Sequence, residues 1–157
     1  ILTPSLGLPT GAKCTIKFSE QVVDVDGVQV CAPVGGDITA QCTPGDTSAV
    51  SWTVDVLQNT VASPENNATG VGRTDALQFV FNASIDPATL AGITLKKGAT
   101  NVAITPTLSG STMNIVKVSG LNLDANSDYV FTFPVTFKDV LGGALPAPIV
   151  INFTTGA

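Results

Sequence analysis

Short runs of β-branched and aromatic residues, separated by glycine and proline at short intervals, constrain the fold of this chain more than any other feature. Valine occurs 19 times and threonine 20 times among the 157 residues, and 15 glycines and 10 prolines lie between and within their runs. β-Branched side chains fit a pleated surface better than a helix, and glycine and proline supply turns. The pattern predicts an all-β domain, either a sandwich or a barrel.

The second half of the chain shows this pattern most clearly. Residues 77–82 alternate apolar and variable positions, and the aromatic side chains of residues 129–137 fall on one face, with Pro134 marking a bulge or a sheet edge. Asp86 followed by Pro87 predicts one short helical turn. The expected strands are residues 77–82, 93–95, 102–105, 113–118, 129–137 and 149–154. About seven strands in about 100 residues is the size of an immunoglobulin-like β-sandwich.

The first third of the chain repeats the end of this second unit. At a fixed offset of 115 positions the matching pairs are Leu6 with Leu121, Leu8 with Leu123, Cys14 with Tyr129, Ile16 with Phe131, Phe18 with Phe133, Asp24 with Asp139, Val25 with Val140 and Gly27 with Gly142. Further on, Trp52 matches Phe153 at an offset of 101, so the first unit contains a 14-residue insertion at about residues 31–44. Such a repeat indicates tandem modules. It also predicts that Trp52 faces a core, as Phe153 does, instead of stacking on a sugar.

The first unit has no counterpart of residues 58–115, which hold about four strands. We therefore expect a partial immunoglobulin-like unit at residues 1–57, made of the C-terminal strands of a module, and a complete β-sandwich at residues 58–157. Half a sandwich has an apolar face with nothing to cover it and exposed strand edges. We expect upstream sequence or another molecule to complete it.

All three cysteines, Cys14, Cys31 and Cys42, lie in the first third of the chain. In an oxidising compartment an odd number leaves one thiol unpaired. Cys31 and Cys42 flank a Gly-Gly-Asp sequence and could close a short loop by a disulfide, which would leave Cys14 for an intermolecular partner. A bridge from Cys14 to one of the other two is an alternative, and so are three reduced, buried thiols.

Asp24-Val25-Asp26-Gly27 places two carboxylates at alternate positions before a glycine, as calcium-binding loops do. The bidentate glutamate of a full EF-hand loop is missing, and Asp-Gly is a strong signal for a hairpin turn. The second copy keeps Asp139 and Gly142 but has Leu141 in place of the second carboxylate. Asp24 and Asp26 therefore read as turn residues, with calcium as a weak alternative and no other cofactor expected.

The composition narrows the function classes. The net charge is −5 with only seven lysines and arginines, which makes nucleic acid and anionic membrane surfaces poor partners. No stretch reaches the roughly 18 consecutive apolar residues that insert into a membrane. The chain has no histidine, the commonest general base and metal ligand, and no catalytic motif, so we do not expect an enzyme.

Several segments of the second unit, taken in order, resemble the SbsA-type bacterial Ig-like domain of S-layer and other cell-surface proteins. They are residues 63–71 with Ser63-Pro64, residues 77–90 ending in Asp86-Pro87-Ala88-Thr89-Leu90, residues 123–133, the turn from Asp139 to Leu145, and the closing Phe153-Thr154-Thr155. Two features depart from the family pattern, namely Asn82-Ala83, where the family often has Ser-Glu, and the cysteine-bearing insertion. The resemblance implies an Ig-like sandwich used as a spacer, stalk or surface-layer module, with no catalytic residues and no fixed ligand.

Three functions follow as hypotheses. The first is a non-catalytic structural or adhesive module of a secreted or cell-surface bacterial protein, whose partners are neighbouring Ig-like domains or copies of itself. The second is a subunit of an extracellular fibre, in which strands of a neighbouring molecule complete the N-terminal unit and Cys14 adds a covalent link. The third is a carbohydrate- or protein-binding module that uses the 31–44 loop to hold a host or cell-wall ligand.

Overall fold

The computed structural model describes residues 7–16, 21–31 and 50–157. The chain divides into two compact units, one of which contains residues 1–11 together with 55–157 and the other residues 12–54. We call them the larger unit and the smaller unit and describe each by itself. None of the helices in the described ranges is long and apolar enough to cross a membrane.

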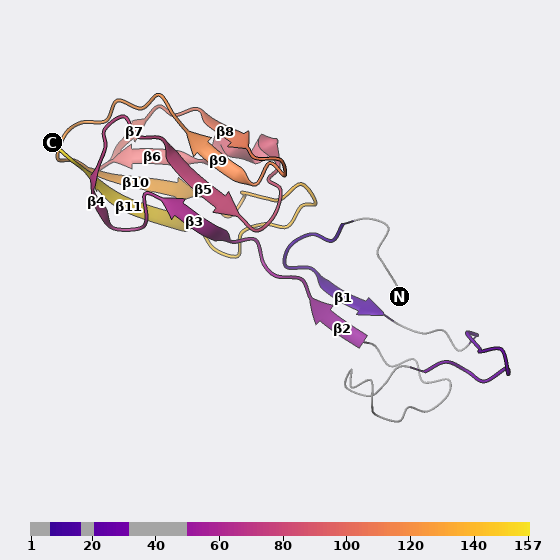
Figure 1. Ribbon diagram of the computed structural model, residues 1–157. Coiled ribbons are helices and arrows are strands. Elements are labelled where there is room, and N and C mark those ends of the chain that lie inside the picture. The colour runs from indigo at the N-terminus through magenta and orange to yellow at the C-terminus, as the bar shows by residue number, and fades with distance from the viewer. Residues whose placement is uncertain (1–6, 17–20, 32–49) are drawn as a thin grey trace. The chain divides into compact units, whose positions relative to one another are not determined.

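The larger unit is a sandwich of two β-sheets (Figure 1). Its strands are β3 (Asn59–Ser63), β4 (Ala68–Val71), β5 (Leu77–Phe81), β6 (Thr94–Lys97), β7 (Thr100–Val102), β8 (Pro106–Ser109), β9 (Ile115–Val118), β10 (Asp128–Phe133) and β11 (Ile149–Thr155). One sheet has the order β4-β11-β10-β6-β7 and the other the order β3-β5-β9-β8. All neighbouring strands are antiparallel except β4 and β11, which are parallel. The predicted all-β, immunoglobulin-like layering is confirmed for this unit.

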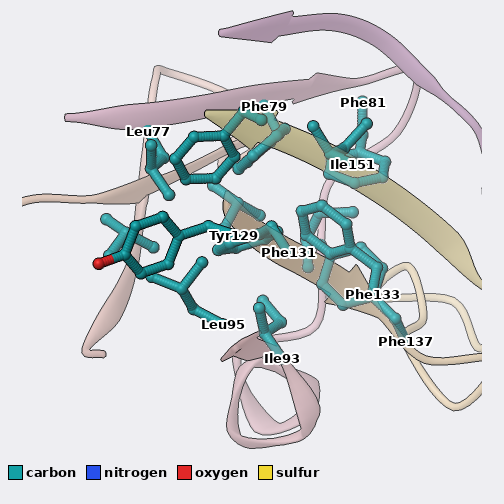
Figure 2. Close-up of a cluster of buried hydrophobic side chains, with 14 of the residues drawn as sticks. Leu77, Phe79, Phe81, Ile93, Leu95, Tyr129, Phe131, Phe133, Phe137 and Ile151 are labelled. Carbon is teal, nitrogen blue, oxygen red and sulfur yellow. The ribbon is translucent and has the colours of Figure 1, made fainter. Parts of the chain in front are cut away.

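Alternating apolar residues build the core between the two sheets. Leu77, Phe79 and Phe81 of β5 are buried, and the strand's intervening residues are more exposed. Because successive side chains of a strand point to opposite faces, this alternation puts one face of β5 in the core. Figure 2 shows the rings of Phe79 and Phe81 meeting those of β10. The Phe79 and Phe131 rings stack with centroids 4.6 Å apart, and Phe133 meets both Phe79 and Phe81 edge to face at 5.1 Å.

A short 3₁₀ helix, η2 (Pro87–Gly92), confirms the predicted helical turn. The side chain of Asp86 accepts a hydrogen bond from the backbone N–H of Ala88 at 2.9 Å, as an N-cap does. Proline at the first helical position costs no hydrogen bond, because that N–H has no partner within the helix. Sequence chemistry therefore explains why the chain turns here between β5 and β6.

Several predicted strand boundaries are wrong, including that of the strand expected at 113–118, which begins at Ile115. The strand expected at residues 129–137 ends at Phe133, because Pro134 has no N–H to donate to the sheet ladder. The strand expected at 102–105 instead occupies Thr100–Val102, and the one expected at 93–95 occupies Thr94–Lys97. These two strands pair with each other through the turn at Gly98, which has a positive φ of 57°.

The smaller unit contains one pair of antiparallel strands, β1 (Lys13–Ile16) and β2 (Val50–Thr53). A further isolated bridge joins Val23 and Gln29 on either side of the Asp24 turn. We expected three or four strands in residues 1–57, and the described part of that segment contains two. Phe18, Cys42 and most of the 31–44 insertion lie outside the described residues.

Candidate interaction sites

The strand pair of the smaller unit has the same register as the pair β10–β11. Cys14 lies opposite Trp52 in the smaller unit, and their repeat counterparts Tyr129 and Phe153 lie opposite each other in the larger unit. The other matching pairs are Lys13–Thr53 with Asp128–Thr154, Thr15–Ser51 with Val130–Asn152, and Ile16–Val50 with Phe131–Ile151. Ile16 and Val50 are 34 positions apart, whereas Phe131 and Ile151 are 20 apart, a difference of 14. The length of the insertion deduced from the sequence therefore agrees with the pairing of the strands.

The backbone just before β1 also repeats the backbone before β10. Val54 N donates to Ala12 O at 2.9 Å, and the counterpart bond runs from Thr155 N to Ser127 O at 3.0 Å. Gly11 and its counterpart Asn126 both have positive φ, 73° and 46°. A left-handed residue at this point reverses the chain into the strand, and glycine and asparagine are the residues that adopt it most readily. The two copies thus share strand pairing and turn geometry.

The Asp24 loop is a turn with the same hydrogen bonds as the Asp139 loop. Asp24 Oδ1 accepts the N–H groups of Asp26 and Val28, both at 2.9 Å. The structure therefore gives Asp24 a local role in the turn, as the repeat predicted. Asp24 and Asp26 are both exposed, and no group of three or more potential metal-ligating side chains occurs in the described parts of the chain. Calcium at this loop remains a weak prediction.

In the second loop Asp139 itself is buried, and it contacts the start of the described chain. Asp139 Oδ1 accepts the N–H groups of Leu141 and Gly143 at 2.8 Å, and its Oδ2 accepts the N–H of Thr10, also at 2.8 Å. Burial acts to raise the pKa of Asp139, but the hydrogen bonds from Thr10, Gly143 and Leu141 outweigh it and hold the pKa below its ordinary value. A buried carboxylate that accepts three N–H groups fixes residues 7–11 against this loop.

Gly143 makes this contact possible. A Cβ added at Gly143 would lie 2.6 Å from the backbone nitrogen of Thr10, which cannot move without breaking its bond to Asp139. This contact was not predicted from the sequence. The signal was present, because glycine where a neighbouring backbone approaches closely is a recurring pattern. In the first copy the same position is Val28, so the two loops differ at the residue where a neighbouring backbone can approach closely.

The smaller unit exposes side chains whose counterparts form the core of the larger unit. Trp52 is 41% exposed and Val22 is 44% exposed, whereas their counterparts Phe153 and Phe137 are 2% and 0% exposed. Trp52 occupies the predicted place in the strand pair, but the prediction that it is buried in a core is wrong for this chain. The described residues of the smaller unit contain no second sheet to cover it. Trp52 and Cys14, which face the same side of the pair, form the candidate interaction surface of this unit.

Leu8 is likewise more exposed than its counterpart in the second copy. It is 37% exposed, whereas its counterpart Leu123 is 2% exposed and donates its N–H to Arg73 O at 3.0 Å. Residues 58–115, which include Arg73, have no counterpart in the first copy. The surroundings of Leu8 therefore differ from those of Leu123 even though the backbone that follows is repeated.

The described cysteines fall into two chemical states. Cys31 takes part in a disulfide, and Cys14 is a half-buried free thiol. Cys42 and the rest of the predicted binding loop lie outside the described residues. The intermolecular link through Cys14 and the ligand-binding role of the 31–44 loop therefore remain predictions.

A shallow groove of about 330 Å³ lies on the outer face of the larger unit, over β10 and β11. It is lined by Asn67, Asp128, Tyr129, Val130, Asn152, Phe153 and Thr154. Two of its polar side chains are already hydrogen-bonded: Asp128 accepts the hydroxyl of Thr154 at 2.6 Å, and Asn152 donates to the nearby Asn66 through both its backbone and its side chain. These contacts join neighbouring segments on the outer face of the sheet.

Comparisons with known proteins agree with this architecture. A profile of the bacterial Ig-like domain matches residues 55–155, whereas no curated protein sequence matches the chain. Among solved structures, CopC from Methylosinus trichosporium OB3b is similar over 64% of this chain and 93% of its own, with a TM-score of 0.53 and 14% identity. At that identity the likeness concerns the fold alone.

Two further structures are similar at lower scores. Domains 1–6 of the surface layer protein SbsC match 64% of this chain and 14% of their own, with a TM-score of 0.45 and 14% identity. The LD transpeptidase LdtMt1, solved in complex with imipenem, matches 64% of this chain and 40% of its own, with a TM-score of 0.42 and 16% identity. Neither likeness carries an argument about what this chain does.

Proposed function

This chain belongs to the bacterial Ig-like domain family, and from this membership we propose that it is a non-catalytic structural and adhesive module of a secreted or cell-surface bacterial protein. It serves as a building block of a stalk or surface layer, and its partners are neighbouring Ig-like modules. The observation that carries the proposal is the internal repeat, because the same strand pair and aspartate loop occur twice in one chain. Modules in series are what a spacer requires.

The disulfide at Cys31 supports the extracellular location. Disulfides form and persist in secreted and cell-surface proteins, whereas the cytosol keeps thiols reduced. We take the low content of charged residues, 12%, as further support for the proposed secreted or cell-surface location.

The strand pair β4–β11 of the larger unit is arranged to resist tension. β4 and β11 are parallel neighbours. The chain therefore enters β4 at one end of the pair and leaves β11 at the opposite end. Pulling on these ends slides the strands along each other and loads their hydrogen bonds together instead of one at a time. Asn67 N donates to Asn152 O at 2.7 Å, and Gly156 N donates to Val71 O at 2.9 Å, one bond at each end of the pair. This geometry suits a module that holds something away from a cell.

Single-molecule stretching of the full chain between handles at its two ends tests this mechanical role. The larger unit is expected to unfold in one step that releases roughly 300 Å of chain, given about 3.5 Å per extended residue. Gly156→Pro removes the N–H donor at the C-terminal end of the β4–β11 pair and should lower the unfolding force. Gly156→Ala is the matched control, because it keeps the donor and its Cβ would lie 3.5 Å from the nearest atom, an ordinary contact. Equal forces for the proline and alanine variants would contradict the proposal that the β4–β11 pair carries the tension.

A fibre subunit is the second candidate, and the exposed Trp52 face with the free thiol of Cys14 favours it. If neighbouring molecules supply the missing strands, the purified chain should form long assemblies on sizing in non-reducing buffer. Cys14→Ser should then shorten them, and deletion of residues 12–54 should abolish them. The module proposal instead expects a discrete monomer in all three samples, so the size distribution separates the two functions.

A further inference from the structure

We propose that the Cys14–Trp52 face of the smaller unit is the docking surface for a β-rich segment of the same kind as residues 57–118, supplied from the N-terminal side of the same polypeptide. This proposal rests on the proposed serial arrangement of modules. In its test the larger unit stays unchanged and serves as the internal reference.

The larger unit shows what covers the counterpart of this face. Tyr129 and Phe153, the counterparts of Cys14 and Trp52, lie opposite each other, and their rings stack with centroids 5.6 Å apart. Both are buried with apolar residues of the sheet β3-β5-β9-β8, which comes entirely from the segment before residue 121. The members of this covering set are Leu77, Phe79, Phe81, Val116 and Val118 of β5 and β9, together with Leu57, which lies just before β3. The segment that fits the Cys14–Trp52 face therefore presents a sheet with such an apolar face.

The strand pairs β1–β2 and β10–β11 have the same register, so their side chains can be compared position by position. All four residue pairs of β1–β2 match consecutive pairs of β10–β11, so the side chains on the shared face occur in the same order. Trp52 stands where phenylalanine stands in the complete module, and a large aromatic ring at that place stabilises a sandwich only when a second sheet covers it. In the described part of the smaller unit Trp52 is 41% exposed instead.

The position of the covering segment in the chain follows from the repeat. In the larger unit the sheet β3-β5-β9-β8 precedes Leu121 in the sequence, and Leu6 is the counterpart of Leu121. The same order places the missing segment before Leu6. A second copy of this chain has its own residues 57–118 committed to its own core and cannot lend them without opening that core.

A chain extended by a copy of residues 57–115 joined directly before Ile1 tests the proposal. The offset of 115 then puts Ile1 where Val116 stands in the complete module. Trp52 is the only tryptophan, and the added copy brings neither tryptophan nor cysteine, so fluorescence and thiol chemistry report on the smaller unit alone. We expect the Trp52 emission to shift to shorter wavelength, acrylamide quenching to fall several-fold, and labelling of the Cys14 thiol to slow by about tenfold or more, because labelling then requires local opening.

The matched control changes the added copy only. Replacing its two phenylalanines equivalent to Phe79 and Phe81 with aspartate destroys the apolar face but leaves the native larger unit intact. Trp52 should then remain as exposed and Cys14 as reactive as in the unextended chain. Equal burial of Trp52 in both extended chains would overturn the proposal, as would concentration-dependent burial of Trp52 in the unextended chain, which would identify a neighbouring molecule as the source.

Hydrogen exchange of the unextended chain gives a second test that needs no engineered segment. Without its covering sheet, the strand pair β1–β2 should exchange its amide hydrogens with little protection, whereas Tyr129 and Phe153 in the larger unit should be strongly protected. Strong protection of the Cys14 and Trp52 amides in the monomer would show that the pair needs no partner and would overturn the docking surface. The larger unit's own protection would be unchanged, so the proposed module function would stand.

Discussion

Replacing Phe133 with alanine should destabilise the larger unit by about 3–5 kcal/mol, the usual cost of truncating a buried phenylalanine. Phe133 is fully buried, and its ring meets the rings of Phe79, Phe81, Phe131 and Phe137 at centroid distances of 5.0–5.2 Å. Because domains of this size are stable by only about 5–15 kcal/mol, the loss is a large fraction of the total. Urea unfolding followed by circular dichroism measures the change in unfolding free energy.

Val150→Ala is the control for this experiment. Val150 lies on β11, in the same sheet as Phe133, but it is 45% exposed. Its truncation should change the unfolding free energy by about 0.5 kcal/mol or less. A Phe133→Ala variant within about 1 kcal/mol of the original chain would mean that the core tolerates the cavity and that the aromatic cluster does not hold the two sheets together.

Replacing Asp139 with alanine should cost about 2–4 kcal/mol, because three N–H groups lose a buried, charged acceptor. The groups belong to Thr10, Leu141 and Gly143. Asp24→Ala is the matched control, since Asp24 accepts the equivalent turn bonds in the smaller unit, where the loop is exposed. The Asp24 variant should leave the unfolding transition of the larger unit unchanged, and equal effects of the two variants would contradict the role given to Asp139.

The same carboxylate gives the stability of the larger unit a predictable pH dependence. The pKa of Asp139 is lower in the folded state than its ordinary value of 3.8, which we take for the unfolded chain. Its contribution is therefore fully present above the unfolded pKa and is lost as the pH falls through the folded pKa. Asp139→Asn removes the titrating group, so the difference in stability between the original chain and this variant should shrink as acid is added. A difference that stays constant with pH would contradict the assignment.

The sequence predicted the elements whose local signals agree with the final packing. The alternation in residues 77–82 and the aromatic face that includes Tyr129 and Phe131 became core strands, because period-two burial is fixed by the geometry of a strand. Asp86-Pro87 became a capped helical turn because both residues act within one turn of the backbone. The register of β1 and β2 agrees with the internal repeat, since two copies of one pattern fold by the same pairing rules.

What the sequence did not predict depends on contacts between distant segments. The parallel pairing of β4 with β11 joins residues more than 80 positions apart, and nothing local marks it. The bond from Thr10 to Asp139 spans 129 positions. The burial of Trp52 was predicted from its counterpart, but burial needs a covering sheet that the strand's own residues cannot specify.

Val28 in the first aspartate loop stands where Gly143 stands in the second. At Gly143 a Cβ would lie 2.6 Å from the nitrogen of Thr10, so the side chain of Val28 excludes a preceding segment from the equivalent seat beside Asp24. The close approach that secures residues 7–11 at Gly143 is therefore not open at the Val28 loop. If such modules stand in series, the two aspartate loops would therefore differ in how firmly each holds the segment that precedes it.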